Sequence, residues 1–294
     1  MDVLLALQQR LSNRLVLRIV LSVLFVFAAT VGGACLGQRR WSDVHLAQQR
    51  LASVLHTDGT GTLSGVDYAE VVLFIAACAA CAVLVPLLAV PLSALATGRW
   101  PRAAAAAKAR CTRHRAERWT ALTSRALSAQ ANGAQQDAAV SQARAQRIAA
   151  YRPNSPTWCG DRFGAAEQRI RVRTGLEIAS AWTWLLQVIP RDAKDDLERT
   201  AAQFDSACEA MGWAVVFTAL GAWWWPAAMV GLAAGFGVWR RQRRAAAVLS
   251  DLAEAVAAMY DGALADAVRV EREKGATRQA IGEAVMRLIH ATWD

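Results

Sequence analysis

Two residue pairs have spacings that could support chemistry. Cys78 and Cys81 form a C-x-x-C pair, the spacing of dithiol redox motifs, within a long apolar run. His114 and Glu117 could supply two ligands to a metal ion. The chain has 6 cysteines without a second pair of this spacing and only 4 histidines, so neither site can be completed nearby. The pattern predicts cysteines that pack as small apolar residues, and neither a metal nor a cofactor.

The usual catalytic motifs are missing from the sequence. There is no phosphate-binding glycine loop, no H-E-x-x-H and no G-x-S-x-G. The stretch 58–62 has too few carboxylates for a calcium loop and predicts an external turn. We therefore expect a protein that is not an enzyme. An intramembrane enzyme that uses Cys78 is a third alternative, after the two functions given below.

Composition indicates an integral membrane protein of the all-α class. Hydrophobic residues make up 55% of the chain and the formal net charge is +9. The charges are gathered in blocks between long uncharged runs, as in membrane proteins. Those runs contain no ionisable residues, which argues against proton-coupled or sodium-coupled transport.

The first two uncharged runs predict two transmembrane helices. Residues 19–38 form a run of 20 residues, and residues 71–98 form a run of 28, each long enough to span a bilayer. Residues 1–18 are leucine-rich with three arginines and predict an amphipathic segment on the membrane surface. Val31 to Cys35 loosely matches a lipoprotein cleavage site, so a signal peptide is the alternative for the first run. Proline residues in the second run predict a kink in its later half.

The third uncharged run, 210–239, predicts a short membrane hairpin. Its two arms of about 14 residues would each extend only about 20 Å, less than a bilayer core. A re-entrant hairpin, two thin spans and one crossing are the three possible arrangements. Tryptophan favours the membrane interface, so the tip residues Trp223, Trp224 and Trp225 are the candidate interface anchors. Gly231 and Gly235 form a small face for close helix contact within or between chains.

The distribution of arginine predicts the topology and a lipid partner. Basic residues dominate 99–118 and 240–244, and the positive-inside rule places these segments and both termini in the cytoplasm. The predicted location is the inner (plasma) membrane. Anionic lipid is the expected partner of these arginines, with nucleic acid the less favoured one. The candidate headgroup residues are Arg99, Arg102, Arg110, Arg113, Arg240, Arg241, Arg243 and Arg244.

The cytoplasmic segments predict helices around one small core. Residues 101–150 are rich in Ala and Arg and predict a solvated helix, which Asn132-Gly133 can interrupt. Residues 151–156 contain two prolines and break the chain, after which 157–189 holds the large apolar residues of the expected core. A helix is then expected from about Ala193 into the hairpin.

The C-terminal segment contains a candidate helix-pairing stripe. Leu249, Leu252, Val256, Met259 and Ala263 recur at alternating spacings of three and four residues, typical of a coiled-coil face on a helix that continues to about residue 273. The helix of 102–150, the helix of 192–209 and the same segment of a second copy are all possible partners. Thr277 predicts the cap of a short last helix.

One block resembles a family of proteins. The residues Pro156-Thr157, Gly160 and Ala165-Ala166-Glu167, followed by Gly175-Leu176-Glu177 and Ala181-Trp182, resemble a block in uncharacterised multi-pass membrane proteins of high-GC actinobacteria. The Trp-rich hairpin with its Arg-rich exit is also similar to that family. The resemblance covers about residues 156–244 and implies no activity or site.

Taken together, these patterns predict four regions and two candidate functions. The regions are 1–98 with two transmembrane helices, 99–209 as a basic helical domain, 210–239 as the hairpin and 240–294 as C-terminal helices. The first function is a membrane-anchored, non-enzymatic scaffold, signalling or assembly protein that pairs as a homo-oligomer or with a helical protein. The alternative is an oligomeric pore-forming or membrane-disrupting effector.

Overall fold

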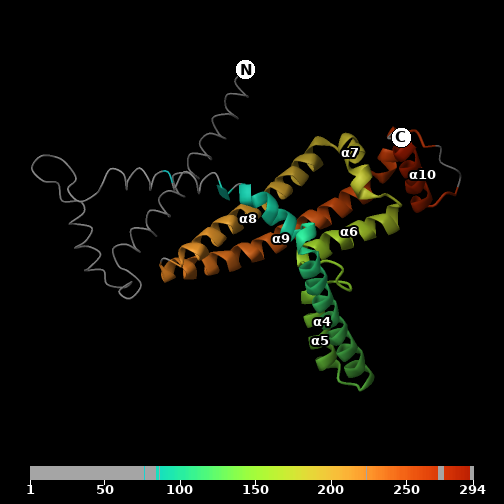
Figure 1. Cartoon of the computed structure of the whole chain (residues 1–294). Helices are drawn as coiled ribbons and strands as arrows, with labels where there is room; N and C mark the ends of the chain where they lie inside the picture. The colour runs from blue at the N-terminus through green and yellow to red at the C-terminus, as the bar shows by residue number, and fades with distance from the viewer. Residues whose placement is uncertain (1–75, 77–83, 86, 223, 271–274, 292–294) are drawn as a thin grey trace, which may run out of the picture. The chain divides into compact units, whose positions relative to one another are not determined.

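The described part of the chain is entirely helical. The computed structural model describes residues 76, 84–85, 87–222, 224–270 and 275–291, and all regular secondary structure in them is helical (Figure 1). This confirms the predicted all-α class. The amphipathic segment 1–18, the run 19–38, the external turn, and the part of 71–98 that contains Cys78 and Cys81 lie outside the described residues. Among the helices that are described, none combines the length and apolar character needed to cross a membrane.

The helices fall into two compact units. A helical stretch at 87–96 comes first, and the elements that follow it are η1 (Arg102–Ala104), α4 (Ala105–Ala131), α5 (Gln135–Ile148), α6 (Trp158–Thr174), α7 (Ile178–Val188), α8 (Arg191–Leu220), α9 (Trp225–Ala267) and α10 (Arg278–Ala291). Unit 1 combines Met1–Leu92 with Cys208–Trp239, and unit 2 combines Ser93–Ala207 with Arg240–Asp294. Both α8 and α9 therefore contribute residues to each unit.

In unit 2, α4 and α5 form an antiparallel pair that packs side by side (Figure 1). The pair turns at Asn132-Gly133, as the sequence predicts, because Gly133 has a φ of 77° that residues with a Cβ rarely adopt. Most of its residues are exposed, and Ala126 and Ala145 are the buried ones within the two helices. Small side chains at the contact let the two helices approach closely without a large apolar core.

A proline-containing loop at 149–157 separates this pair from α6. The side chain of Thr157 accepts a hydrogen bond from the Gly160 N–H at 3.1 Å and so caps the first turn of α6. Thr157 also donates to the carbonyl of Ala96 at 2.6 Å, which joins the helix start to the segment before η1. Gly175, with φ 72°, ends α6 in the left-handed conformation.

The main core of unit 2 gathers side chains from α6, α7, α8, α9 and α10. Leu176, Leu185, Leu264 and Val285 are fully buried at its centre. The prediction of a core within 157–189 is confirmed for Leu176, Leu185 and Ile189. The sequence did not identify the contributions of α9 and α10, which supply much of the remainder. In α10, Thr277 accepts from the Ala280 N–H at 3.3 Å, so the predicted cap is present.

Two glycines allow α10 to pack directly on the end of α6. A Cβ on Gly282 would overlap the carbonyl oxygen of Thr174, and one on Gly175 would overlap the carbonyl of Gln279. We expect Gly282→Ala to lower the free energy of unfolding by about 1–3 kcal/mol, because the backbones must separate to admit the methyl group. Chemical denaturation measures the change.

The matched control is another helical glycine in the same unit. A Cβ on Gly164 in α6 would have no atom within 4 Å, so Gly164→Ala should raise the free energy of unfolding by about 0.5–1 kcal/mol through helix propensity alone. Equal effects of the two substitutions would contradict the close packing of α10.

In unit 1, the end of α8 and the start of α9 form a tight helical hairpin. A Cβ on Gly231 would lie 2.5 Å from the Thr218 backbone nitrogen, and one on Gly235 would lie 3.5 Å from the Ala214 Cβ. These pairs run in opposite directions along the two helices, so the arms are antiparallel. The helical hairpin predicted for 210–239 is therefore present, and the interpretation of 210–239 as one continuous helix is wrong. The glycine face packs within the chain.

The hairpin arms continue well beyond the apolar run. The sequence predicted membrane arms of about 14 residues and a helix that runs from about Ala193 into the first arm. The structure agrees for the first arm, because α8 begins at Arg191 and has 30 residues, and α9 has 43 residues. Charge does not end either helix, because charged side chains project into solvent, and arginine, lysine and glutamate are good helix formers. Among the described residues between them, Gly221, Ala222 and Trp224 are not helical.

Candidate functional site

Arg115 of α4 holds the loop 149–157 in unit 2. Its guanidinium donates to the carbonyls of Ser155 at 2.6 Å and Ile148 at 2.8 Å. Its Nη1 also lies 2.8 Å from Oδ2 of Asp161 in an ion pair. The Arg115 and Asp161 side chains are only 18% and 10% exposed, so both charges are largely removed from water.

Asp161 closes the same loop from the side of α6. Its Oδ1 accepts hydrogen bonds from the backbone N–H groups of Asn154 at 2.8 Å and Ser155 at 2.7 Å. Its Oδ2 is buried and accepts no well-directed hydrogen bond, so the charge of Arg115 is what stabilises it. Trp119 of α4 also holds the loop, since its indole N–H donates to the Ala149 carbonyl at 3.1 Å. The loop is thus fixed at both of its ends.

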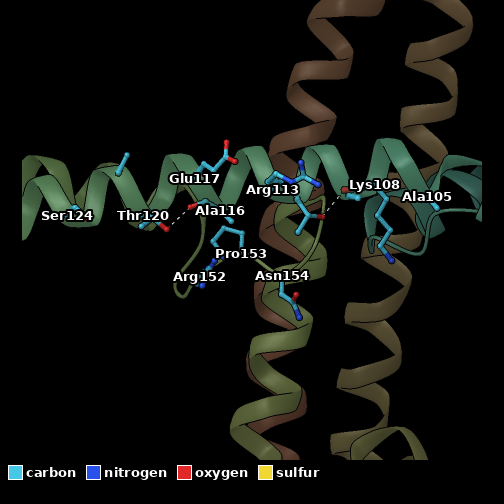
Figure 2. A pocket seen from close by; sticks show the side chains of 13 residues that line it. Ala105, Lys108, Arg113, Ala116, Glu117, Thr120, Ser124, Arg152, Pro153 and Asn154 are labelled. Atoms are coloured by element: carbon cyan, nitrogen blue, oxygen red, sulfur yellow. Dashed lines mark hydrogen bonds between the residues drawn. The ribbon is translucent and has the colours of Figure 1, made fainter.

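A groove runs along α4 beside this loop. Its volume is about 1090 Å³, and Figure 2 shows its lining by one face of α4 together with Arg152, Pro153 and Asn154. Small residues such as Ala109 and Ala116 form most of that face. Lys108, Arg113 and Glu117 are its charged side chains on the helix.

A second hollow of about 720 Å³ is lined by α6 together with residues of the same loop. It shares Arg152 and Asn154 with the groove, and Trp158 and Tyr151 are its aromatic lining residues. We call this hollow the α6 cavity. Its charged lining consists of Arg152, Asp161, Arg162, Arg169 and Arg173.

Acids on α9 hold three of these arginines. Arg169 and Arg173 bond the two oxygens of Glu254 at 2.7 and 3.0 Å, and Arg162 pairs with Asp251. Burial of the Arg169 guanidinium opposes its charged form, but hydrogen bonding and attraction to Glu254, with a smaller contribution from Tyr151, raise its pKa above the ordinary value. These pairs fix α6 against α9 and also fix the guanidinium positions.

Arg243 occupies a different environment from the other predicted headgroup residues. Its guanidinium carbon lies 4.3 Å from the centre of the Trp158 ring, a cation–π contact, and it donates to the Arg147 carbonyl at 3.2 Å. Burial lowers the pKa of Arg243 below its ordinary value; Cys159 opposes that shift, and the like charge of Arg115 adds to it. The Arg243 side chain is thus already engaged within its own unit.

The other predicted headgroup arginines are at the surface. Arg113 lines the α4 groove, and the remaining exposed side chains are Arg99, Arg102, Arg110, Arg240, Arg241 and Arg244. The four from 99–113 belong to the start of α4 and the segment before it, and the others belong to one stretch of α9. Sequence reasoning grouped Arg243 with its neighbours because sequence spacing does not reveal which side of a helix meets an aromatic ring.

The predicted helix-pairing stripe is divided by the fold. Val256 is 3% exposed in the core of its own chain, and Leu249 and Leu252 pack against that core. Met259 is instead 66% exposed. The buried part packs in the main core. Leu197 of the expected 192–209 helix belongs to that core, as do residues of α7 and α10, which were not among the expected partners. Met259 and Val248 are the large apolar residues of α9 that stay exposed in unit 2.

The tryptophan tip is described in part. Trp223 lies outside the described residues, Trp224 belongs to the turn and Trp225 begins α9 with 38% exposure. The indole nitrogen of Trp224 is buried and has no hydrogen-bond partner among the described residues.

Sequence reasoning missed the residues that build the α6 cavity. Arg162, Arg169 and Arg173 follow one another at spacings of seven and four, which places them on one face of a helix, and this signal could have been found. Asp161 and Arg115 gave no comparable signal, because 46 residues separate them in the chain. Within the described ranges there is no cluster of three or more residues suited to hold a metal ion.

Comparison with known protein families, curated proteins and solved structures finds no match to this chain. The resemblance to actinobacterial membrane proteins therefore stays a prediction. The arginines and acids of α4, α6 and α9 can bind and position charged groups.

Proposed function

We propose that this protein is a non-enzymatic scaffold or assembly protein of the plasma membrane, with the 210–239 hairpin embedded in the bilayer. The observation that carries the proposal is the exposed apolar surface of that hairpin. Its large apolar residues with exposures from 43 to 60% are Val215, Met229, Val230, Leu232, Phe236 and Trp239. Burying such side chains in lipid is favourable by about 25 cal/mol per Å².

The charge pattern of the hairpin supports the same placement. No ionisable residue lies between Glu209 and Arg240, so nothing in the hairpin opposes insertion. Arms of about 14 apolar residues extend about 20 Å, which suits a re-entrant hairpin that enters the bilayer and returns. Arg240, Arg241 and Arg244 follow the second arm and are exposed, as groups that bind anionic headgroups must be.

In this proposal the helical unit 2 faces the cytoplasm and carries the partner-binding surface. The core already uses Leu249, Leu252 and Val256, so the exposed face of α9 with Val248 and Met259 is left for a second copy or another helical protein. The absence of catalytic motifs in the sequence is the reason for preferring a scaffold to an enzyme.

Cysteine accessibility tests the membrane placement with a closely matched control. Leu232 in the hairpin and Leu127 in α4 are 60% and 63% exposed, so cysteines at the two positions should react at equal rates if both face water. In a cysteine-free full-length background reconstituted into phosphatidylglycerol-containing vesicles, we expect Leu232→Cys to react with an aqueous maleimide at least about tenfold more slowly than Leu127→Cys. Both should react fully in SDS. Equal rates in vesicles would place the hairpin in water and end the proposal.

A further inference from the structure

The α6 cavity has the size and lining of a ligand site. Its volume of about 720 Å³ lies within the range of roughly 300–1,000 Å³ typical of small-molecule pockets. Trp158 and Tyr151 supply flat aromatic surface, while Asn154, Gln146 and Gln168 supply neutral polar groups. A ligand there would meet both apolar and polar chemistry.

The charge of the cavity favours an anion. Four arginines and one aspartate line it, and the arginines still outnumber the acids when Asp251 and Glu254 behind them are counted. Arg243 and Arg115, packed against Trp158 and Asp161, add further positive charge. An anion would therefore enter an electropositive site.

The arginines also keep hydrogen-bonding capacity. A guanidinium has five N–H donors, and the ion pairs of Arg162 and Arg173 use only some of them. Their acidic partners fix the position of each guanidinium group, so less side-chain entropy is lost when a ligand binds. Arg152 has no ion pair within the described residues and lines both the α4 groove and the α6 cavity.

We propose that the α6 cavity binds an organic phosphate. The phosphate is held by Arg152 with the α6 arginines, because guanidinium forks match phosphate oxygens. The remainder of the molecule packs against Trp158 and Tyr151. This chemistry has two possible sources, a soluble nucleotide or the headgroup of an anionic phospholipid. The proposal does not depend on where the hairpin lies.

Binding to the purified full chain in neutral detergent micelles tests the proposal. ADP is the soluble probe and dihexanoyl phosphatidylglycerol is the headgroup probe, with dihexanoyl phosphatidylcholine, which is zwitterionic and has no net charge, as the comparison. Titration calorimetry gives the affinity, and the rise in melting temperature with probe concentration checks that the native state binds. We expect saturable binding of ADP or of phosphatidylglycerol.

Three variants separate this cavity from general attraction to a basic protein. Arg152→Gln removes a charge-assisted contact and should weaken binding about tenfold or more. Gln168→Glu places a negative charge in the lining and should weaken binding in the same direction. Arg171→Gln removes an exposed arginine of the same helix that does not line the cavity, and should leave the affinity within about twofold.

Each outcome decides the matter. If Arg152→Gln and Gln168→Glu weaken ADP binding and Arg171→Gln does not, the proposal is supported with a soluble ligand. If these two variants weaken only the binding of phosphatidylglycerol, it is supported with a lipid headgroup as the ligand. The proposal is overturned if neither probe binds saturably at millimolar concentration. It is also overturned if all three variants lower the affinity equally. Failure here would leave the maleimide result for Leu232 untouched, so the two proposals stand or fall separately.

Discussion

Replacing Asp161 with alanine is expected to lower the free energy of unfolding by about 3–5 kcal/mol. The substitution leaves the guanidinium of Arg115, 18% exposed, without its countercharge, and leaves the N–H groups of Asn154 and Ser155 without an acceptor. Removing one partner of a buried pair is costly because the remaining charge cannot regain its water. Urea unfolding of the full chain, followed by tryptophan fluorescence, gives the change.

The control is an ion pair that water already reaches. Asp196 and Arg199 are 60% and 70% exposed and lie 3.0 Å apart, so Asp196→Ala should change stability by less than about 1 kcal/mol. Adding Arg115→Met to Asp161→Ala should recover part of the loss, since the uncompensated charge is then gone. If Asp161→Ala were no more harmful than Asp196→Ala, the loop would not depend on the buried pair.

Replacing Val256 with aspartate is expected to cost about 4 kcal/mol or more, enough to unfold much of unit 2. Val256 is 3% exposed and packs among the apolar residues of the main core, where nothing compensates a carboxylate. Thermal unfolding by circular dichroism measures the loss, together with the mass of the particle by light scattering in detergent.

Met259 gives the matched substitution on the same helix. Because its side chain is 66% exposed, Met259→Asp should change stability by no more than about 0.5 kcal/mol. If the outer face of α9 joins two copies, Met259→Asp should halve the protein mass of a dimer while the melting temperature stays unchanged. A melting temperature equally low in both variants would mean that Met259 belongs to the core.

The helix-pairing stripe shows that residues with the same spacing in the sequence can differ in burial. Leu249, Leu252, Val256 and Met259 satisfy one spacing rule, yet the fold buries Val256 and leaves Met259 in solvent. An α-helix has 3.6 residues per turn, so a stripe drifts around the axis. Which part of it is buried depends on where the neighbouring helices cross.

Several features followed directly from the residues. The long uncharged runs and the segments rich in alanine and arginine determined the all-α class, because both residue patterns favour helices. Local conformational rules determined the turn at Gly133 and the cap at Thr277, since each depends on the chain within a few residues. The break between two antiparallel helices at 221–224 belongs to the same group, because glycine and proline act locally.

Only the tertiary structure decided which charges are used inside the protein. Arg243 and Arg244 are adjacent in sequence, but one lies over the Trp158 ring and the other is exposed. Asp161 meets Arg115, and Glu254 meets Arg169 and Arg173, across separations that no sequence spacing records. The physical reason is that electrostatic partners are chosen by distance in space and by shared burial. The sequence by itself therefore determined the helical class, the turn at Asn132-Gly133 and the Thr277 cap, while the packing of the helices created the α6 cavity and assigned each arginine to the interior or to the surface.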